Sequence, residues 1–179
     1  AGWREILSDS VVEYMDRQKK SGNLEEEYHS LGEKQIGLVL QEEEGFPRKL
    51  LEIPDPPYGL FYKGKLPEQK QPSVAVIGAR ECSEYGRFVA EELGRYLGSQ
   101  EIQVISGMAR GIDGISQQAA LLAGGTSYGV LGCGVDICYP RQNRKLYEEL
   151  IQKGGLLSTY APGTKALPAY FPPRNRIVS

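Results

Sequence analysis

The chain contains few of the residues that most often carry out chemistry in small enzymes. It has one histidine, His29, and three cysteines, Cys82, Cys133 and Cys138, which show no CxxC spacing. Zinc sites usually draw their ligands from closely spaced Cys and His residues, so no metal site is expected. His29 stands in an acidic stretch far from the cysteines, which argues against a Ser-His-Asp or Cys-His catalytic site. Isolated thiols of this kind are typical of the reducing cytoplasm.

The sequence also lacks long hydrophobic runs. No stretch approaches the roughly 20 apolar residues that a transmembrane helix needs. The first ten residues, AGWREILSDS, carry charges where a signal peptide would have its apolar part. With 40% hydrophobic and 25% charged residues among 179, the composition is that of a soluble globular protein. We therefore expect a cytoplasmic protein with no membrane partner.

An excess of charge of one sign is missing as well, because the net charge is only −2. Residues 1–71 carry 10 Lys and Arg against 14 Asp and Glu, and residues 72–179 carry 11 against 9. A balance this close to neutral does not by itself predict a nucleic-acid-binding protein. Any site for an anion must therefore come from local geometry.

What the sequence does contain is a glycine-rich turn between a strand and a helix, within residues 103–125. Val104 and Ile105 end an apolar run, small residues fill most of 106–111, and apolar residues then recur three or four apart. Such a turn directs free backbone N–H groups and the positive end of a helix toward one point, where phosphate or another anion binds. An ordinary strand-to-helix turn without a ligand has the same pattern, and the turn alone does not decide between the two.

The rest of the chain after residue 72 repeats this alternation. We expect strands at 73–77, 103–105, 126–131 and 155–158, and helices at 84–97, 112–123 and from about 143 through 151. The uninterrupted apolar run at 73–77 is typical of a parallel strand covered on both faces. The alternation predicts an α/β fold with a doubly wound parallel sheet, in which ligands bind beyond the carboxyl ends of the strands.

Residues 1–71 are organised differently. Apolar residues at helical spacing predict an amphipathic helix over residues 3–15. The four prolines between residues 42 and 66 exclude a single regular element there, although 60–62 form an apolar extended piece. We therefore divide the chain into a small helical module with a proline-rich connector, 1–71, and an α/β domain, 72–179.

Six motifs, taken together, resemble those of one family. They are Gly78-Ala79-Arg80, SEYG (83–86), SGMARGID (106–113), VLGCGVD (130–136), YPRQN (139–143) and FPPRNRI (171–177). In this order and at this spacing they resemble the DprA/Smf family of bacterial DNA-processing proteins, which act in natural transformation. The connector FPRKLLEIPDPPYGLFYKG is also similar, so the resemblance extends from residue 46 to the last residue.

The resemblance implies a binding protein without a cofactor rather than an enzyme. Members of the family bind single-stranded DNA with little sequence preference, protect it and help load the RecA recombinase; the full-length protein is a possible homodimer. The family resemblance also implies an extended Rossmann fold, a SAM-like helical module before it and often a winged-helix domain after it. Because the chain stops right after RNRIV, we expect a fragment that lacks the C-terminal part of the Rossmann-like sheet.

With this resemblance, the DNA contacts are expected from glycine turns and a few cations. Arg80 follows the first strand, the backbone of 106–111 cradles a phosphate, Asn143 donates hydrogen bonds and Phe171 offers a stacking face. Ser106 bonds either a phosphate or only its own turn. The full set of candidate DNA- and phosphate-binding residues is Gly78, Arg80, Ser83, Gly86, Ser106, Gly107, Ala109, Gly111, Asp113, Asn143, Phe171, Arg174, Asn175 and Arg176.

Several of these candidates have a purely structural alternative. Arg80 and Arg176 can pair with Asp113 or Asp136 instead of binding phosphate. Phe171 can be an anchor in the core. Asp113 stands in the first turn of the expected helix, where a carboxylate stabilises the helix dipole, and this use is favoured over catalysis.

The sequence departs from the family pattern at two places. The helix that follows GID usually carries an Ala-His pair, and here these positions are Ser116 and Gln117. A glutamine still forms hydrogen bonds, but it cannot become a cation at mildly acidic pH. After the last expected strand, Ser158-Thr159 stands where Ser-Glu is common. Neither change removes the glycine turns, so the expected phosphate binding is retained.

Two other functions remain open at this point. A nucleotide-hydrolysing enzyme of the wider Rossmann-like group would use Asp113 or Asp136 as general base. Against it, no glutamate stands in a Gly-Thr turn like that of the cytokinin-activating phosphoribohydrolases. A mononucleotide sensor would use the same phosphate cradle, and competition between mononucleotides and oligonucleotides separates it from a DNA-binding protein.

Overall fold

The computed structural model describes residues 24–178 and divides the chain into two units, Ala1–Gln35 and Ile36–Ser179. In the first unit, the described residues form helix α2 (Leu24–Glu33). Its first turn carries Glu25, Glu26 and Glu27, which suit the positive end of the helix dipole. The helix expected over residues 3–15 lies outside the described residues.

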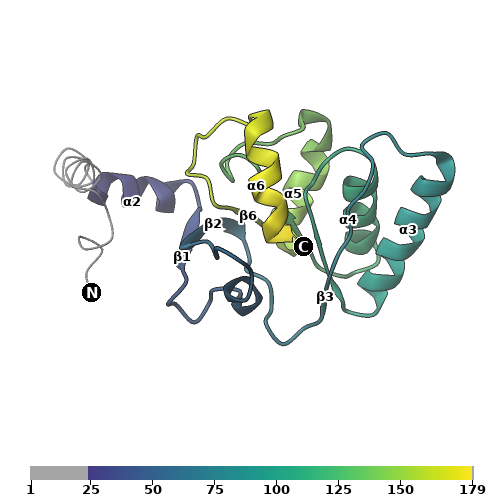
Figure 1. The fold of residues 1–179 in the computed structure, drawn as a ribbon, viewed down its shortest axis with the longest axis horizontal. Coiled ribbons are helices and arrows are strands. Elements are labelled where there is room, and N and C mark those ends of the chain that lie inside the picture. The colour runs from purple at the N-terminus through teal and green to yellow at the C-terminus, as the bar shows by residue number, and fades with distance from the viewer. Residues whose placement is uncertain (1–23, 179) are drawn as a thin grey trace. The chain divides into compact units, whose positions relative to one another are not determined.

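The second unit is built on one six-stranded sheet (Figure 1). Its strands are β1 (Gly37–Leu40), β2 (Gly59–Gly64), β3 (Ser73–Ala75), β4 (Gln103–Ser106), β5 (Ser127–Val130) and β6 (Gly155–Ser158). Their spatial order is β1-β2-β6-β5-β4-β3. Strands β3 to β6 are parallel, whereas β1 pairs antiparallel with β2 and β2 with β6. The predicted α/β class with a parallel sheet is thus confirmed.

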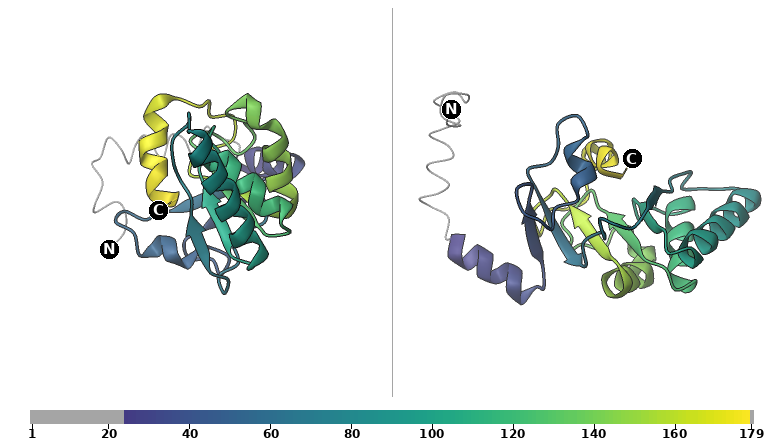
Figure 2. Two further views of the ribbon diagram at one scale, coloured as in Figure 1. Left: turned by 90° about the vertical axis from the view of Figure 1, so that its right-hand side faces the viewer. Right: turned by 90° about the horizontal axis from the view of Figure 1, so that it is seen from below.

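Helices cover both faces of this sheet. Helices α3 (Glu84–Ser99), α4 (Ile112–Leu122) and α5 (Arg144–Lys153) connect the parallel strands and lie on one face. Figure 2 shows α6 (Phe171–Val178) and the short 3-10 helix η2 (Arg48–Leu51) on the other face. Two further 3-10 turns, η3 (Arg141–Asn143) and η4 (Pro168–Tyr170), precede α5 and α6. Within residues 24–178, no helix combines the length and the apolar character that a membrane span requires.

The connector contributes two strands to the sheet. Phe61 of β2 stands opposite Ser158 of β6, and Gly64 stands opposite Gly155. Beyond this register, the Lys65 N–H donates a hydrogen bond of 2.7 Å to the carbonyl oxygen of Gly154. The compact unit that holds the parallel strands thus begins at Ile36 and includes β1 and β2 of the connector, which belong to the same sheet.

Alternate residues of the strands feed two cores, one on each face of the sheet. The larger core joins the sheet to η2 and α6, and its fully buried members include Phe46, Leu60, Val130 and Leu157. The smaller core lies under α3 and α4 and contains Val76, Leu97, Val104 and Ala120. The turns at the carboxyl ends of the strands are thus held from both sides.

Strand β3 differs from its prediction. The strand ends at Ala75, and the side chains of Val74 and Ile77 are 38% and 64% exposed. The expectation of cover on both faces was wrong, because β3 is the last strand of the sheet in the described part of the chain and only β4 pairs with it. Val76, which points into the smaller core, is the buried residue of this run.

Candidate functional site

The turns after β3 and β4 are joined by one buried carboxylate. Asp113 is 6% exposed; its Oδ1 accepts a hydrogen bond from the Gly78 N–H (3.3 Å) and its Oδ2 accepts one from the Gly107 N–H (3.1 Å). The favoured alternative for Asp113, a structural use rather than catalysis, agrees with these bonds. The carboxylate fixes the distance between the two turns that carry Arg80 and the amide cradle.

Gly111 brings the same two turns into direct contact. Its φ of +74° and ψ of −133° lie in a region that side chains disfavour, and a Cβ there would stand 2.1 Å from the Ala79 carbonyl oxygen. The next residue, Ile112, donates its N–H to the same oxygen at 3.2 Å. The backbone before Arg80 therefore rests on the start of α4.

The free amides of the cradle are fewer than the sequence indicates. The Gly107 N–H is bound by Asp113, and the Met108 N–H donates to Oε1 of Gln117 at 3.2 Å. Within residues 24–178, the N–H groups of Ala109, Arg110 and Gly111 donate no hydrogen bond. The amides left for an anion are thus those of residues 109–111, at the start of α4.

Ser106 does not face this cradle. Its hydroxyl is fully buried and donates a hydrogen bond of 2.5 Å to the Val76 carbonyl oxygen. Neither of the two roles considered for Ser106 is seen, because the hydroxyl bonds neither its own turn nor a group in the cradle; it links the end of β4 to the residue that follows β3.

Gln117 lies directly beneath the cradle and is also fully buried. Besides the bond to Met108, its Nε2 donates to Oγ of Ser127 at 3.0 Å and to the Tyr128 carbonyl oxygen at 3.1 Å. Every hydrogen-bonding atom of the amide is used inside the protein. The position where the family pattern has a histidine thus carries a buried amide that supports the glycine turn.

Arg174 is buried, although its sequence context, PPRNR, suggests a surface cation. Its Nη1 donates to the carbonyl oxygen of Gly107 at 2.9 Å and also to that of Val130. Burial lowers the pKa of this guanidinium, while the nearby Asp113 carboxylate acts in the opposite direction. Arg174 thus ties α6 to the glycine turn and places a positive charge behind it.

A stack of rings and guanidinium groups stands beside the turn. The Phe171 ring centroid lies 5.6 Å from that of Tyr139, with 23° between the ring planes. The Arg80 guanidinium lies 5.5 Å from the Phe171 centroid, and that of Arg174 lies 5.9 Å from it, both within the range of cation–π attraction. Tyr139 is 45% exposed, so this stack presents an aromatic face next to the long, charged side chain of Arg80.

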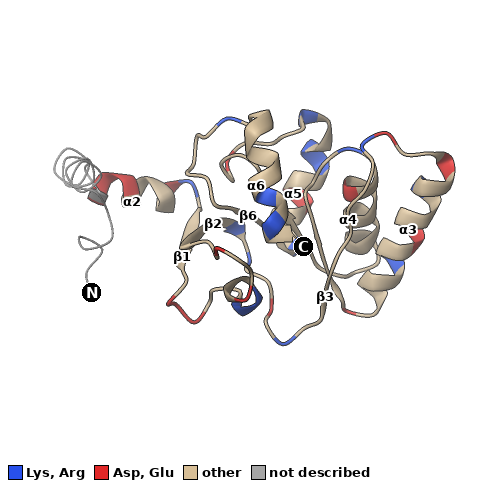
Figure 3. Cartoon of the chain, viewed as in Figure 1, with Lys and Arg blue, Asp and Glu red and all other residues tan. Residues whose placement is uncertain are grey.

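These groups border one pocket of about 430 Å³ at the carboxyl end of the parallel strands, which we call the rim pocket. Its lining includes four arginines and no acidic residue: Arg80, Arg110, Arg141 and Arg174. Figure 3 shows basic residues on α6 and at the start of α5, the elements that approach this end of the sheet. The pocket combines positive charge with the Tyr139 and Phe171 rings.

Twelve of the fourteen candidate residues fall into three groups. Those that line the rim pocket are Arg80, Gly107, Ala109, Phe171 and Arg174. Gly111 and Asn143 line a neighbouring groove that Arg80 also borders, and Asn143 donates its Nδ2–H groups to the carbonyl oxygens of Met108 (3.0 Å) and Ala109 (3.1 Å). The residues that support these turns or cap helices are Gly78, Ser83, Gly86, Ser106 and Asp113.

The remaining two candidates lie on α6 outside the rim pocket. Asn175 is exposed and accepts a hydrogen bond from Nε of Arg174 at 3.3 Å. Arg176 forms an ion pair with Asp55. The alternative pairing of Arg176 with Asp113 or Asp136 is therefore wrong, and the structure gives Arg80 no such pair either; Asp136 instead accepts the Gly163 N–H at 2.9 Å.

Sequence reasoning missed four residues that line the rim pocket or its entrance. They are Arg110, Tyr139, Arg141 and Gln142. All four belong to motifs that had been recognised, SGMARGID and YPRQN, in which only other positions were singled out. The signal that could have found them is the concentration of arginine and tyrosine in loops expected at the carboxyl ends of strands.

Three buried groups of the second unit stay protonated at neutral pH. Burial, together with the charge of Glu68, raises the pKa of Tyr128 to about 12. Burial likewise raises the pKa of Tyr147 to about 12 and that of the Cys133 thiol to about 11, although Arg174 acts against the shift of Cys133. Among the described residues, no three His, Cys, Asp or Glu side chains gather as a metal site would require.

Comparison with known proteins gives consistent matches. The family model described as DNA recombination-mediator protein A matches residues 37–179. The DNA processing protein DprA of Streptococcus pneumoniae is 42% identical over 134 residues, which are 75% of this chain and 47% of that protein. The chain therefore spans about half the length of this relative.

Two solved structures share the fold. The X-ray structure of DprA from Streptococcus pneumoniae superposes with a TM-score of 0.80 at 35% identity and covers 92% of this chain and 57% of that one. The second is a structure of DNA processing protein A from Helicobacter pylori, described for its single-stranded DNA binding mode. It superposes with a TM-score of 0.70 at 30% identity and covers 80% of this chain and 64% of that one. The similarity thus extends over the whole Rossmann-like part of the chain.

Proposed function

Because this chain belongs to the DNA recombination-mediator protein A family, we propose that it binds single-stranded DNA in the rim pocket, protects the strand and helps load it with the RecA recombinase during natural transformation. One observation carries the proposal. Unused amides at 109–111, exposed arginines and the Tyr139–Phe171 pair meet at one end of the sheet. Single-stranded DNA needs this combination of phosphate donors and stacking faces.

Each group has a defined part in this binding. A backbone phosphate lies against the free N–H groups of 109–111, where the start of α4 adds a partial positive charge. Arg80 and Arg110 neutralise the same phosphate or its neighbour, because both guanidinium groups are exposed. A base stacks on the exposed face of Tyr139, which Phe171 supports from behind. None of these contacts reads a base edge, which agrees with binding that tolerates any sequence.

The enzymatic alternative has less support in the geometry. Both carboxylates considered as general base accept hydrogen bonds from backbone N–H groups, Asp113 from Gly78 and Gly107 and Asp136 from Gly163. A base that abstracts a proton must instead reach the reacting group within hydrogen-bond distance. We therefore propose a binding protein, with DNA rather than a reaction as its function.

Fluorescence anisotropy with labelled oligothymidine tests this proposal. The wild-type chain is expected to bind with an affinity that falls as salt rises, because phosphate contacts release counterions. Arg80→Ala is expected to weaken binding, and Tyr139→Ala to weaken it about 5- to 160-fold, the usual range for loss of one base-stacking ring. Unaltered affinity in both variants would contradict the rim pocket as the binding site.

A competition measurement separates DNA binding from nucleotide sensing. AMP or ATP in large excess is expected to displace labelled oligothymidine poorly, because a mononucleotide makes only one of several phosphate contacts. Displacement by micromolar mononucleotide would favour the sensor. Arg48→Gln, in η2 and outside the lining of the rim pocket, serves as a charge-matched control and is expected to bind like the wild type.

A further inference from the structure

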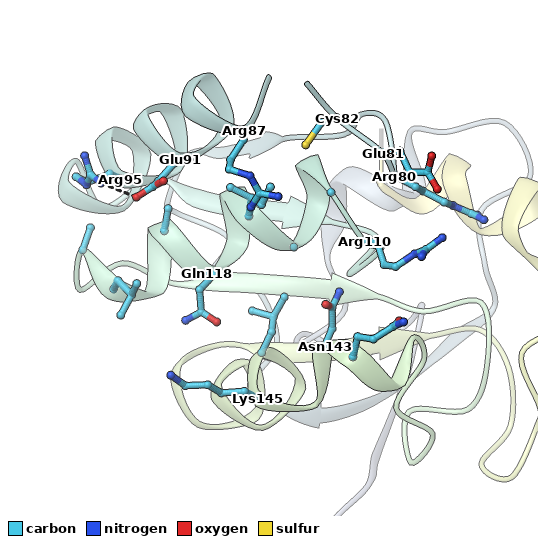
Figure 4. Close-up of a pocket in the computed structure, with 18 residues that line it drawn as sticks. Arg80, Glu81, Cys82, Arg87, Glu91, Arg95, Arg110, Gln118, Asn143 and Lys145 are labelled. Atoms are coloured by element: carbon cyan, nitrogen blue, oxygen red, sulfur yellow. Dashed lines mark hydrogen bonds and ion pairs between the residues drawn. The ribbon is translucent and has the colours of Figure 1, made fainter. Parts of the chain in front are cut away.

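A second and larger concavity adjoins the rim pocket on the helical face of the sheet. It has a volume of about 840 Å³, and we call it the α4 groove because α4 forms its floor. Side chains of α3 form one wall, and the start of α5 forms the other (Figure 4). The floor residues, Gly114, Ile115, Ala119 and Leu122, are small or apolar, and Leu122 is 72% exposed.

The walls of the groove carry more positive than negative charge. Five basic residues line it against two acidic ones, Glu81 and Glu91. Arg95 is already paired with Glu91 at 3.0 Å and with Glu92, and Nζ of Lys145 lies 3.8 Å from Glu149. In the part of the chain that the structure describes, Arg87 and Arg110 form no ion pair and no side-chain hydrogen bond.

These two unpaired guanidinium groups face the same space. Figure 4 shows Arg87 extending from α3 over the groove, with Arg110 and Asn143 at one end and Gln118 and Lys145 on the opposite side. An exposed arginine without a partner binds an anion without first breaking an existing salt bridge. Phosphate is the anion that such separated, solvent-facing cations bind most readily along a groove.

The groove is continuous with the rim pocket. Arg80, Arg110 and Gln142 line both. A strand held at the amides of 109–111 therefore leaves the rim pocket past Arg110 and enters the α4 groove directly. With 11 residues, α4 is about 16 Å long, which spans roughly three to five successive phosphates of an extended single strand.

We propose that the α4 groove is a second segment of the single-stranded-DNA path, which takes about three to five nucleotides beyond those in the rim pocket. Arg87, Arg110 and Lys145 contact their phosphates, and the bases lie over the apolar floor of α4. This inference rests on the proposed function. An amphipathic helix of a partner protein would also fit an apolar floor, but the excess of unpaired arginine favours a polyanion.

A length series of oligothymidine tests the groove separately from the rim pocket. The double variant Arg87→Gln/Lys145→Gln is expected to bind a 2-mer, which the rim pocket holds alone, with the same Kd as the wild type. The wild type is expected to bind a 12-mer more tightly than the short oligonucleotide, and the double variant is expected to lose most of this gain in affinity. Its salt dependence should also be weaker, by about 1.4 in the slope of log K against log salt concentration for two lost phosphate contacts.

Two further variants make the outcome specific. Arg80→Ala, in the rim pocket, is expected to weaken binding of both lengths. Arg48→Gln/Lys49→Gln removes two charges from η2 on the opposite face of the sheet and is expected to leave both affinities unchanged. Equal affinity of the groove variant and the wild type for the 12-mer, with equal salt slopes, would contradict DNA binding in the α4 groove. That result would favour an amphipathic helix of a partner protein as its occupant. Failure of the wild type to bind either length would instead overturn the proposed function itself.

Discussion

The guanidinium of Arg174 occupies the space that a side chain at Gly107 would need. Its Nη1 donates to the Gly107 carbonyl oxygen at 2.9 Å, and a Cβ on residue 107 would stand 2.8 Å from both Nη atoms and from Oδ2 of Asp113. Both of these charged groups are buried and hydrogen-bonded, so neither moves aside without losing partners. The shape of the glycine turn therefore depends on α6, which lies far along the chain.

Gly107→Ala tests this dependence. The added methyl group must displace Arg174 or Asp113, and we expect the free energy of unfolding to fall by about 1–3 kcal/mol, as for other overpacked sites. Oligonucleotide binding is expected to weaken too, because the amides at 109–111 shift with the turn. Urea denaturation and anisotropy measure the two effects. Gly45→Ala, whose Cβ would meet its nearest atom at an ordinary 3.4 Å, is the control and should change stability by less than about 0.5 kcal/mol.

Gly111→Ala is expected to cost more than conformational strain alone. A side chain there meets both a positive φ and the Ala79 carbonyl oxygen at 2.1 Å. Gly163 provides the matched comparison, since its φ is +81° but no atom lies within 4 Å of its Cβ position. We expect Gly163→Ala to destabilise by about 1 kcal/mol and Gly111→Ala by clearly more, roughly 2–4 kcal/mol. Equal losses in thermal or urea unfolding would mean that the contact between the two turns is unimportant.

Gln117→Leu tests the buried amide under the cradle. The substitution keeps the volume nearly constant but leaves the Met108 N–H and the Tyr128 carbonyl without this partner. Buried unsatisfied groups cost about 1–3 kcal/mol each, so we expect a loss of about 2–4 kcal/mol in urea unfolding. The neighbouring Gln118, partly buried and bonded only to Glu149, gives the contrast. Gln118→Leu should cost under about 1 kcal/mol, and a similar loss in both variants would contradict the assigned role of Gln117.

The stability of the protein is expected to fall at alkaline pH. Tyr128, Tyr147 and Cys133 have pKa values of about 12, 12 and 11 in the folded protein, above their ordinary values of 10.0, 10.0 and 9.0. Below pH 9 these groups are protonated in both states and their contribution to the free energy of unfolding is complete. It is lost as the pH rises through 11 to 12, because the unfolded chain, with its lower pKa values, loses these protons at a lower pH than the folded protein does.

Urea unfolding between pH 8 and pH 11 measures this loss. Tyr128→Phe removes one of the three titrating groups, together with its hydrogen bond of 3.2 Å to the Leu66 carbonyl oxygen. The variant is expected to be less stable at pH 8 but to lose less stability than the wild type on going to pH 11. Parallel pH profiles for the two proteins would show that Tyr128 does not titrate with a raised pKa.

The elements that sequence reasoning placed best are those with strong local signals. The helix expected at 112–123 is α4 at Ile112–Leu122, and the predicted cap Ser83 accepts the Gly86 N–H at 3.1 Å at the start of α3. Sequence reasoning also expected Arg80, Gly107 and Asn143 at one edge of the sheet, where the carboxyl ends of parallel strands meet. Arg80 and Gly107 line the rim pocket, and Asn143 donates to the carbonyl oxygens of Met108 and Ala109 beside it.

What the sequence did not indicate depends on contacts between distant segments. Arg174 has the flanks of a surface residue, yet it is buried because α6 packs across the turn of Gly107. Nothing local to β3 shows that it has a neighbour on one side only. The pairing of the connector strand β2 with β6 likewise has no short-range signature, since antiparallel pairs without a hairpin can join any two segments.

The pairing of β2 with β6 also has a consequence for the order of events on the ribosome. Phe61 stands opposite Ser158, so roughly 100 residues are translated between the emergence of the hairpin β1–β2 and that of its partner. At about 5–20 residues per second, the hairpin waits on the order of 5 to 20 s with one side open to other nascent chains. The amino-terminal strands therefore join the sheet late, and a synthesis pause between them and β6 would lengthen the interval in which misassembly occurs.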